Sequence, residues 1–574
     1  VILLDMPFSR LIEDWLARYT QAQWRGCRLE GWLFEGLEAR RQAEAKLAEA
    51  GVSARLHSAY KPLVHAILED IDTNGVVGAE IRYPVLPGLS AERFLLEAYP
   101  LADLLPGLRF IAEKGEHPVY TVTLRRAGGI QTLRIEAPNT WAADHQGLSA
   151  YSPCAWLRIT RPNGEISVDQ AERAEYQRLF DTAMDCIAQH PWGKTEPYFE
   201  RLSLRADIPP LETPLPGGET ASTSEALHED LYFSVLEFFQ HYSGRPPGDR
   251  GLQPGQIVPD IRLAEQPRLR ITIEAFTPAG RLTPRQPERA LNECAEPLTL
   301  SEVAHTLATL GGQEYEAPTR QGRRVLWRYF EGRETPVLIS AAQHANETSG
   351  VIGALRAAPK LQGAFALLPL ENPDGYALFE DLRAWHPNHM HHAARYSALG
   401  DDVAFREGPP AGESVARHEA IARSGAQLHI NLHGYPSHEW TRPLRGYLPR
   451  GFESWTLPKG FFWVLQYHPG WAGQAQRLAK TATAKLAQAV PALAGFNRSQ
   501  RARRAVYAAS DNWPLFNGIP VMLRESGREL APVSLITEFP DETLYGAAYR
   551  FAHTVQMHTV LAATAAWREI NVVG

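Results

Sequence analysis

The stretch QHANETSG, residues 343–350, contains a histidine and a glutamate at a spacing that can bind a metal ion. His344 and Glu347 follow the apolar run PVLISAA and stand three residues apart, so both side chains can turn toward one point. A catalytic zinc ion typically has three protein nitrogen or oxygen ligands and one position open for water. A histidine and a glutamate at this spacing also occur often by chance, on solvated turns. The pair therefore indicates a metal site only if the chain supplies a third ligand and a base.

Two further segments carry suitable residues at the ends of apolar runs. His433 ends the run AQLHINL and enters a turn with Gly434, and Glu538 ends the run VSLIT. Buried strands of an α/β sheet end at one edge, where such proteins place their sites. We therefore expect the three segments to converge. His429, four residues before His433, is interpreted as a packed strand histidine, because His433 is the one at the turn.

Four stretches, QHANETSG, LENPDGYALF, INLHGY and ITEFPDETLYG, together resemble the zinc carboxypeptidase family, and the resemblance covers about residues 296–565. It implies that His344, Glu347 and His433 bind one zinc ion and that Glu538 acts as general base and then as general acid. It also implies that the turn NPDG, residues 372–375, shapes one wall of the site. Zinc lowers the pKa of bound water toward ~7 and polarises the carbonyl group of the substrate. A glutamate within hydrogen-bond reach takes the proton and transfers it to the leaving amine.

A second glutamate competes for the role of base. Glu525 lies in NGIPVMLRES, and the family often has "GI" a few residues before its catalytic glutamate. Glu538 is favoured, because it ends the last apolar run and is followed, as in the family, by a predicted closing helix, YGAAYRFAHTVQMHTVLAA.

The chain departs from the family where the substrate carboxylate would be held. Family members have an asparagine-arginine pair between the NPDG turn and the third ligand, whereas this chain has ARYSALGDDVAFREG, with Asp401 and Asp402 in that place. One of these aspartates could orient His344, a known use of carboxylates behind metal ligands. Arg395 is the nearest guanidinium that could bind an oxyanion or a carboxylate, and Arg383 and Arg406 lie behind it.

Further polar residues of this half could take part in the site. Tyr507 stands where the family often has a mobile tyrosine over the substrate. The segment AWHPNHMHH has four histidines in seven residues. A second metal site is one interpretation, and a polar loop beside the active site is the favoured one. The four are His386, His389, His391 and His392.

Composition excludes several classes of function. The 574 residues are 44% hydrophobic and 21% charged, as expected for a globular protein, and the net charge of −7 argues against nucleic acid as the main partner. No apolar run has the length of a membrane span. Four cysteines, far apart, form neither a disulfide framework nor a thiolate metal site. The first residues have no basic region or cleavage site typical of a signal peptide, so a cytoplasmic location is expected.

The elements that must position the site form a two-part chain. From residue 296 to 574, short continuous apolar runs alternate with helical patterns, which predicts an α/β domain with a mixed, twisted central sheet flanked by helices. Residues 1–205 mix helical and strand patterns and predict an N-terminal α+β domain of unknown role, with a hairpin around Gly128 and Gly129. Residues 206–295, rich in proline and glycine, predict a linker-rich connection that contains one helix and one strand.

The expected function is a zinc-dependent hydrolase that cleaves a peptide or other amide bond with metal-activated water. The alternative is a deacylase or amidase that acts on a small N-acyl or modified amino acid, which the missing asparagine-arginine pair favours. A non-catalytic binding protein on a peptidase scaffold is less expected, because all ligand types are present. The expected partner is a peptide or small amide substrate, with no nucleic acid and no membrane, and an oligomer is compatible with the sequence.

Overall fold

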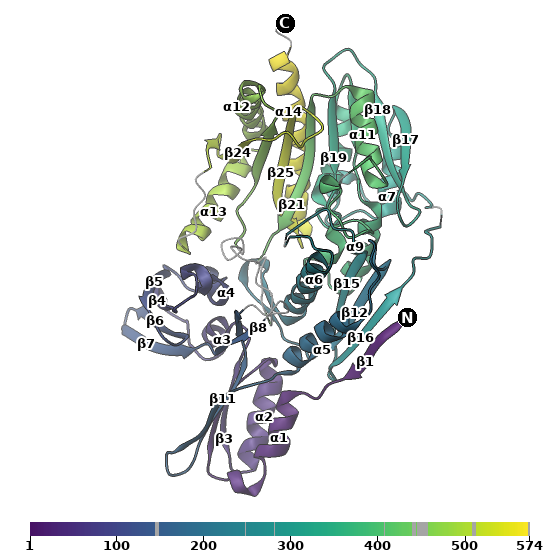
Figure 1. The fold of residues 1–574 in the computed structure, drawn as a ribbon. Coiled ribbons are helices and arrows are strands. Elements are labelled where there is room, and N and C mark those ends of the chain that lie inside the picture. Colours follow the sequence, from purple (N-terminus) through teal and green to yellow (C-terminus); the bar gives the residue numbers. More distant parts are fainter. Residues whose placement is uncertain are drawn as a thin grey trace.

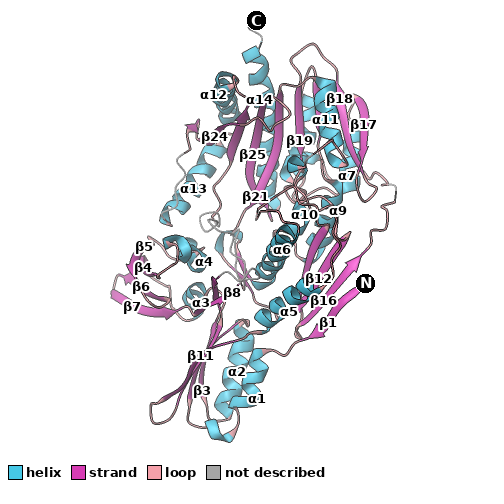
Figure 2. Cartoon of the chain, in the orientation of Figure 1, coloured by secondary structure: helices cyan, strands magenta, loops and turns pink. Residues whose placement is uncertain are grey.

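A computed structural model of the chain describes residues 1–143, 149–246, 248–280, 282–406, 408–438, 444, 457–507 and 513–571 (Figures 1 and 2). In the described residues, the N-terminal half contains three four-stranded sheets, and the C-terminal half contains one sheet of nine strands.

The first small sheet has the order β11-β10-β2-β3, and helices α1 and α2 lie beside it (Figure 1). Its strands are β2 (Arg28–Leu33), β3 (Ser53–Ser58), β10 (Ala155–Thr160) and β11 (Ile166–Glu172), and its helices are α1 (Leu11–Tyr19) and α2 (Leu37–Glu49).

The second small sheet has the order β5-β4-β6-β7. Its strands β6 and β7 form the predicted hairpin around Gly128 and Gly129, with Arg126 opposite Gly129. The elements of this region are α3 (Pro62–Glu69), β4 (Val76–Val85), α4 (Leu95–Ala98), β5 (Arg109–Lys114), β6 (Val119–Arg126), β7 (Gly129–Glu136) and the hairpin of β8 (Asn139–Ala143) and β9 (Ser149–Pro153).

The third sheet joins segments from the whole N-terminal half in the order β1-β16-β12-β15. Its elements are β1 (Ile2–Pro7), β12 (Arg201–Ile208), β15 (Gln256–Leu263) and β16 (Arg268–Glu274), with helices α5 (Glu175–Gln189) and α6 (Thr223–Tyr242) and the short hairpin of β13 (Glu212–Pro214) and β14 (Thr220–Ser222). The boundary predicted at residue 205 therefore lies inside β12. Residues 206–295 supply two strands and a largely buried helix to this unit, because their apolar residues pack with those of residues 1–205 in one core.

The nine-stranded sheet has the order β17-β18-β20-β19-β21-β25-β22-β24-β23. Strands β20, β19, β21 and β25 are parallel to one another, whereas β22 is antiparallel to β25. The strands are β17 (Gln313–Pro318), β18 (Arg324–Phe330), β19 (Val337–Ala341), β20 (Phe365–Leu368), β21 (Leu428–Pro436), β22 (Phe462–Tyr467), β23 (Leu515–Phe516), β24 (Ile519–Glu525) and β25 (Val533–Glu542).

Helices cover both faces of this sheet. Helices α8, α12 and α14 pack on one face and α11 on the other. The helices of this half are α7 (Leu300–Thr309), α8 (Ser349–Ala357), α9 (Pro373–Trp385), α10 (His392–Arg395), α11 (Glu413–Ser424), α12 (Ala472–Ala489), α13 (Ala492–Val506) and α14 (Gly546–Asn571). The predicted mixed α/β sheet with flanking helices, preceded by an α+β region, is confirmed. Among the described helices, none combines the length and the apolar character that crossing a bilayer requires.

Candidate metal centre and active site

Three parallel strands bring the predicted residues to one edge of the large sheet. Strand β19 ends at Ala341, and the next residue, Ala342, has φ 49°, a left-handed conformation that turns the backbone sharply toward His344. Strand β21 is the neighbour of β19, and β25 is the neighbour of β21. In this register His433 of β21 lies directly opposite Glu538 of β25, so their side chains project from the same face at the same level.

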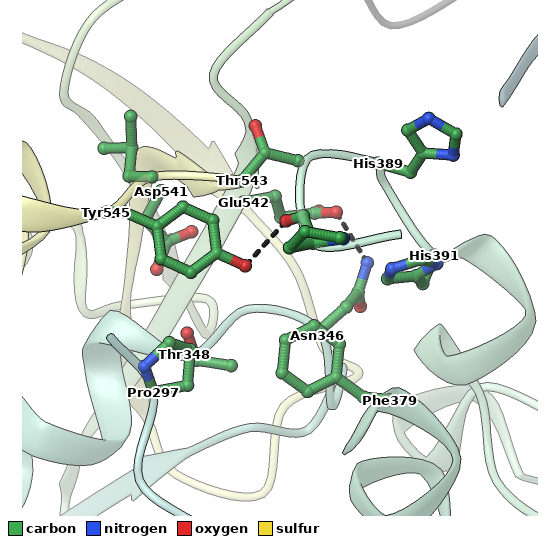
Figure 3. A pocket seen from close by; sticks show the side chains of 12 residues that line it. Pro297, Asn346, Thr348, Phe379, His389, His391, Asp541, Glu542, Thr543 and Tyr545 are labelled. Carbon is green, nitrogen blue, oxygen red and sulfur yellow. Dashed lines mark hydrogen bonds between the residues drawn. The ribbon is translucent and has the colours of Figure 1, made fainter. Parts of the chain in front are cut away.

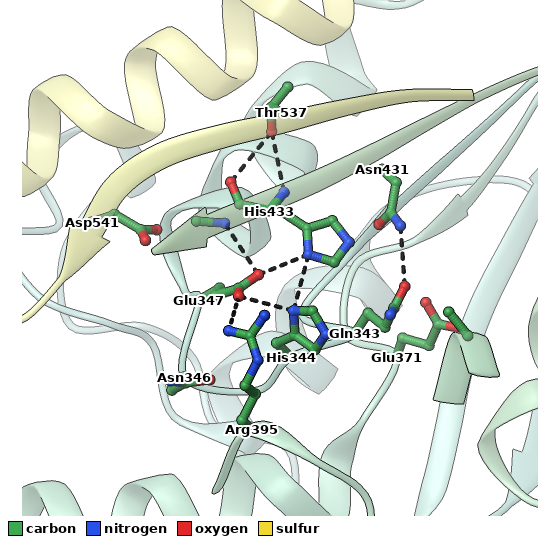
Figure 4. A network of polar contacts seen from close by, with 12 residues as sticks. Gln343, His344, Asn346, Glu347, Glu371, Arg395, Asn431, His433, Thr537 and Asp541 are labelled. Atoms are coloured by element: carbon green, nitrogen blue, oxygen red, sulfur yellow. Dashed lines mark hydrogen bonds and ion pairs between the residues drawn. The ribbon is translucent and has the colours of Figure 1, made fainter. Parts of the chain in front are cut away.

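His344, Glu347 and His433 converge on one point (Figure 4). The Nδ1 atoms of the two imidazoles are 3.1 Å apart. Glu347 Oε1 is 2.9 Å from Nδ1 of His344, and Glu347 Oε2 is 2.8 Å from Nδ1 of His433. The three side chains are buried, and the backbone N–H of Gly434 donates to Glu347 Oε2 at 3.1 Å.

This donor set fits a divalent cation such as zinc. Two imidazole nitrogens and a carboxylate are the ligand types of catalytic zinc sites. Within the described parts of the chain, the three residues form the single histidine, cysteine or acidic cluster in which three ligand atoms lie within 4.8 Å of one another. Behind His344, Asp402 Oδ2 lies 3.2 Å from Nε2, the orienting contact that the sequence allowed for one of the two aspartates.

Charged groups close to the three residues shift the pKa values of the carboxylates there. Burial alone would raise the pKa of Glu347, but the facing His344 and Arg395 outweigh it and hold the pKa well below its usual value. Burial would also raise the pKa of Asp402, and the adjacent His344 instead lowers it. Both carboxylates therefore stay ionised. This is the state in which Glu347 can bind a metal ion and Asp402 can accept a hydrogen bond from His344.

Arg395, the predicted substrate residue, lies directly at this centre. It is the last residue of helix α10, and its Nη1 donates to Glu347 Oε1 at 2.6 Å. Burial would lower the pKa of Arg395, but Glu347 and other nearby acidic groups raise it instead. The guanidinium is therefore a fixed positive charge within contact distance of a predicted ligand.

The two candidate bases are separated by the length of a strand. Glu538 stands opposite Phe462 of β22, whereas Glu525 stands opposite Tyr467, at the other end of the same strand. Five residues of β-strand span about 17 Å. Glu525 is exposed there, while Glu538 is beside the metal centre, where burial and then Glu347 raise its pKa well above the usual value.

The chain has no asparagine-arginine pair where the resemblance would place the substrate-carboxylate clamp. Asp401 and Asp402 stand there instead. The next guanidinium, Arg406, is committed to a buried ion pair with Asp401, at 2.7 Å, and also to Glu413. Of the arginines considered from sequence, Arg395 therefore remains the one at the centre.

The histidine-rich segment packs against the N-terminal half. His386 bonds to the carbonyl of Ile261, and its ring stacks on His389. His389 Nε2 lies 3.1 Å from Ser222 Oγ. His389 and His391 also line a small cavity, with room for about one water molecule, beside the metal-binding turn (Figure 3). These contacts fit the polar loop that the sequence favoured.

Within this cavity, Asn346 Nδ2 donates to Glu542 Oε2 at 2.7 Å. The hydroxyl of Tyr545 donates to the carbonyl of Pro387 at 2.6 Å and so links the histidine-rich segment to the residues after β25 (Figure 3).

Two further predicted side chains lie away from the centre of the site. His429 is buried and bonds to Ser340 Oγ at 2.7 Å, as expected for a packed strand histidine. Tyr507 accepts a hydrogen bond from the N–H of Ala102 and stacks on Phe110, so in this structure it belongs to the contact with the N-terminal half.

Sequence reasoning missed several polar residues around the centre. Gln343, Arg417 and Asn431 form hydrogen bonds behind His344, and Asp541 accepts from the N–H of Ser349 at the start of α8. Gln343 is adjacent to His344 in sequence, but nothing in the spacing marks Arg417, which is 74 residues further on.

Searches of protein-family models and of curated proteins find no match to this chain. Solved structures match in part. A metallo-carboxypeptidase from Burkholderia cenocepacia is 15% identical and covers 53% of this chain and 75% of its own, with a TM-score of 0.29. Carboxypeptidase A from Helicoverpa armigera is 13% identical over 49% of this chain and 76% of its own, with a TM-score of 0.30. A succinylglutamate desuccinylase/aspartoacylase from Rhodobacter sphaeroides is 14% identical over 44% and 63%, with a TM-score of 0.25. At such low values, function has to be inferred from the side chains of this chain.

Proposed function

We propose that the chain is a metal-dependent hydrolase that cleaves an amide bond in the manner of a carboxypeptidase. His344, Glu347 and His433 would hold one zinc ion, with Glu538 as general base and then acid and Arg395 as the oxyanion- or carboxylate-binding residue. The observation that carries the proposal is the convergence of two Nδ1 atoms and one carboxylate within 3.1 Å of one another, level with Glu538 on the next strand.

Each side chain of the site has a different role in the proposed reaction. When bound, the ion supplies Lewis-acid chemistry, which lowers the pKa of water and polarises a carbonyl group. Glu538 accepts the proton of the attacking water and returns it to the leaving nitrogen. Its raised pKa suits this exchange, because a carboxyl group that titrates closer to neutral pH both accepts and releases a proton. Arg395 offers a fixed guanidinium to the negative charge that develops on the substrate oxygen.

One observation favours a second candidate, a deacylase or amidase of a small N-acyl or modified amino acid. Asp401 and Asp402 occupy the place of the asparagine-arginine pair, and the nearby Arg406 is bound to Asp401. A peptide C-terminus would then have to rely on Arg395 alone. A substrate without that carboxylate leaves Arg395 available for the oxyanion.

Metal analysis of the purified protein tests the basis of both candidates. We expect about one zinc ion per chain and loss of the ion in His344→Ala and His433→Ala. A folded protein that binds no divalent metal would support a non-catalytic binding role and would overturn the proposal.

Matched substitutions test the base. Glu538→Gln should keep the metal and lower kcat by about 10²- to 10⁴-fold, because proton transfer is lost while metal ligation is unchanged. Glu525→Gln is the control and should retain full turnover, since Glu525 lies at the opposite end of the sheet. Equal loss in both variants, or loss only in Glu525→Gln, would reject Glu538 as the base.

A substrate panel separates the two candidates. Peptides with free C-termini are compared with the same peptides amidated and with N-acyl amino acids. Release of C-terminal residues from ordinary peptides identifies a carboxypeptidase, whereas cleavage limited to N-acyl amino acids identifies the deacylase.

A further inference from the structure

A line of buried polar side chains runs from behind His344 to helix α11. Gln343 Oε1 accepts from Arg417 Nη2 at 2.6 Å and from Asn431 Nδ2 at 3.1 Å. On its other side, Gln343 Nε2 donates to Asp402 Oδ1 at 2.8 Å. Asp402 Oδ2 then faces His344 Nε2 at 3.2 Å. Figure 4 shows the first part of this line, with Gln343 between Asn431 and His344.

The direction of the Gln343 amide is fixed by its partners. An arginine guanidinium carries only donors, so the carbonyl oxygen of Gln343 must face Arg417. The amide N–H groups then face Asp402, whose carboxylate can only accept. Oδ1 of Asp402 also accepts from the N–H of Ala404 at 3.1 Å, which leaves Oδ2 for His344.

We propose that Gln343 and Arg417 are positioning residues for the metal centre and that they act through Asp402. With Asp402 Oδ2 held against Nε2, His344 carries its proton on Nε2 and directs the Nδ1 lone pair toward the point that Glu347 and His433 also face. The inference rests on the proposed function, because it concerns the affinity of the same three ligands for their ion.

Burial makes this line sensitive to a change in any member. Gln343 is 5% exposed, Arg417 8% and Asp402 1%, so water does not replace a lost hydrogen bond at low cost. Arg417 is balanced by Glu371, whose Oε2 accepts from the same Nη2 at 2.7 Å. The guanidinium of Arg417 is thereby fixed between Glu371 and the side-chain amide of Gln343.

The test measures zinc affinity by competition titration and the ligand geometry by the visible absorption spectrum of the cobalt(II)-substituted protein. Gln343→Glu keeps the size of the side chain and the acceptor for Arg417, but it turns a carboxylate oxygen toward Asp402. We expect zinc affinity to fall about 10- to 100-fold and the cobalt spectrum to change. Arg417→Met should give a similar loss, and Arg417→Lys should recover part of it.

Asn497→Asp is the matched control for an amide-to-acid change in the core. Asn497 is 2% exposed and bonds to the backbone of Phe461 and Gly518, with no contact to the metal ligands. This variant should lower the Tm and leave zinc affinity and the cobalt spectrum unchanged.

The possible outcomes distinguish a failure of the positioning role from a failure of the proposed function. Unchanged zinc affinity in a folded Gln343→Glu variant overturns the positioning role while the proposed function stands. If that variant does not fold, equal affinities in Arg417→Met and Arg417→Lys overturn the role. A wild-type protein that binds neither zinc nor cobalt overturns both proposals.

Discussion

Gly434 follows His433 directly and has no room for a side chain. A Cβ atom there would lie 1.9 Å from Asp541 Oδ1 and 3.0 Å from the carbonyl oxygen of Phe539. The N–H of Gly434 donates to Glu347, and Asp541 Oδ2 accepts from the N–H of Ser349. Because residue 434 is a glycine, the carboxylate of Asp541 can lie directly against β21 and still bind the start of helix α8.

Gly434→Ala should therefore damage the metal centre. Overpacking costs about 1–3 kcal/mol, and here the displaced groups are Asp541 and the backbone that supports Glu347. We expect a lower Tm and weaker zinc binding. Gly473→Ala is the control, because a Cβ at Gly473 in α12 meets no atom within 4 Å. It should leave zinc affinity unchanged and raise stability slightly, since alanine is the better helix former. Normal zinc affinity in Gly434→Ala would contradict this account.

At the scale of residues, the sequence indicated which ligand-type side chains come together, but not which side chains bind behind them and hold them in place. His344, Glu347 and His433 were found because each stands at the end of an apolar run, a local signal. Gln343 and Arg417 carry no such signal, since their contact depends on how α11 lies against the sheet. Tyr507 stands where the family often has a tyrosine over the substrate, whereas its ring packs here with the N-terminal half, which the family resemblance does not cover.

At the scale of elements, the NPDG turn joins helix α9 to the segment that carries Arg395. Asn372 Oδ1 accepts from the N–H of Gly375 and caps α9, while its Nδ2 donates to the carbonyl of Tyr396, both at 2.9 Å. A Cβ on Gly375 would lie 2.5 Å from Asn372 Nδ2, so the glycine keeps this contact open. The turn thus acts on the site through Arg395, one residue before Tyr396.

Asn372→Ala should cost more than the loss of a helix cap. Loss of the cap costs about 0.5–2 kcal/mol, and the unpaired carbonyl of Tyr396 adds about 1–3 kcal/mol. The control is Thr299→Ala, which removes the capping hydroxyl of α7 without a contact to the Arg395 segment. Urea denaturation should show the larger loss for Asn372→Ala, and only this variant should raise KM. Equal losses and an unchanged KM would contradict the coupling.

A second pair of elements predicts a dependence of stability on pH. Glu175, the first residue of α5, accepts from the N–H of Leu11 at the start of α1, at 3.1 Å. Burial and then the nearby Glu35 raise the pKa of Glu175 from 4.5 to about 7. The unfolded chain thus releases this proton at lower pH than the folded one, so stability falls as the pH rises from about 4.5 to 7, by up to about 3 kcal/mol.

Glu175→Gln should remove this dependence, because an amide stays neutral and keeps an acceptor for Leu11. The difference in unfolding free energy between variant and wild type should grow in favour of the variant from pH 5 to pH 8. If plots of unfolding free energy against pH remained parallel for the two proteins over this range, Glu175 would not be the source of the pH dependence.

The sequence predicted the type of each element better than it predicted which elements lie next to one another. The apolar runs at residues 337–341, 428–433 and 533–538 are strands of the large sheet, because continuous burial on both faces leaves a local pattern. The proline- and glycine-rich stretch around residue 210 has the composition of a linker. It forms a short hairpin before α6, since it packs against the rest of the N-terminal core, and that contact leaves no local pattern.

At the scale of the whole molecule, the N-terminal half holds the active-site segment that precedes β21. Asp402 donates its N–H to the carbonyl of Arg250 at 3.0 Å, and the N–H of Gly255 donates to the carbonyl of Leu399 at 2.9 Å. His392, at the start of α10, stacks on Tyr232 of α6. Residues 386–402 therefore lie between the two halves, and both Arg395 and Asp402 depend on the N-terminal half for their positions.

Glu225, near the start of α6, links the two halves directly. Its Oε1 accepts from the N–H of Met390 at 2.8 Å and faces His438 Nε2 at 2.6 Å, five residues after His433. The carboxylate is fully buried. One side chain of the N-terminal half therefore fixes the histidine-rich segment and the chain that leaves β21.

Glu225→Gln should loosen this link without removing the metal. A hydrogen bond to a charged group is worth about 1.5–3 kcal/mol, so amide hydrogen exchange in residues 386–396 should accelerate about 10- to 100-fold. Zinc affinity should stay the same, because Glu225 contacts none of the three ligands, while KM should rise as Arg395 becomes less ordered. Glu44→Gln is the control: Glu44 also accepts a backbone N–H, that of Leu56, but far along the N-terminal half. It should leave exchange in residues 386–396 unchanged. If Glu225→Gln left exchange there unchanged as well, the N-terminal half would not hold the active-site segment through this carboxylate.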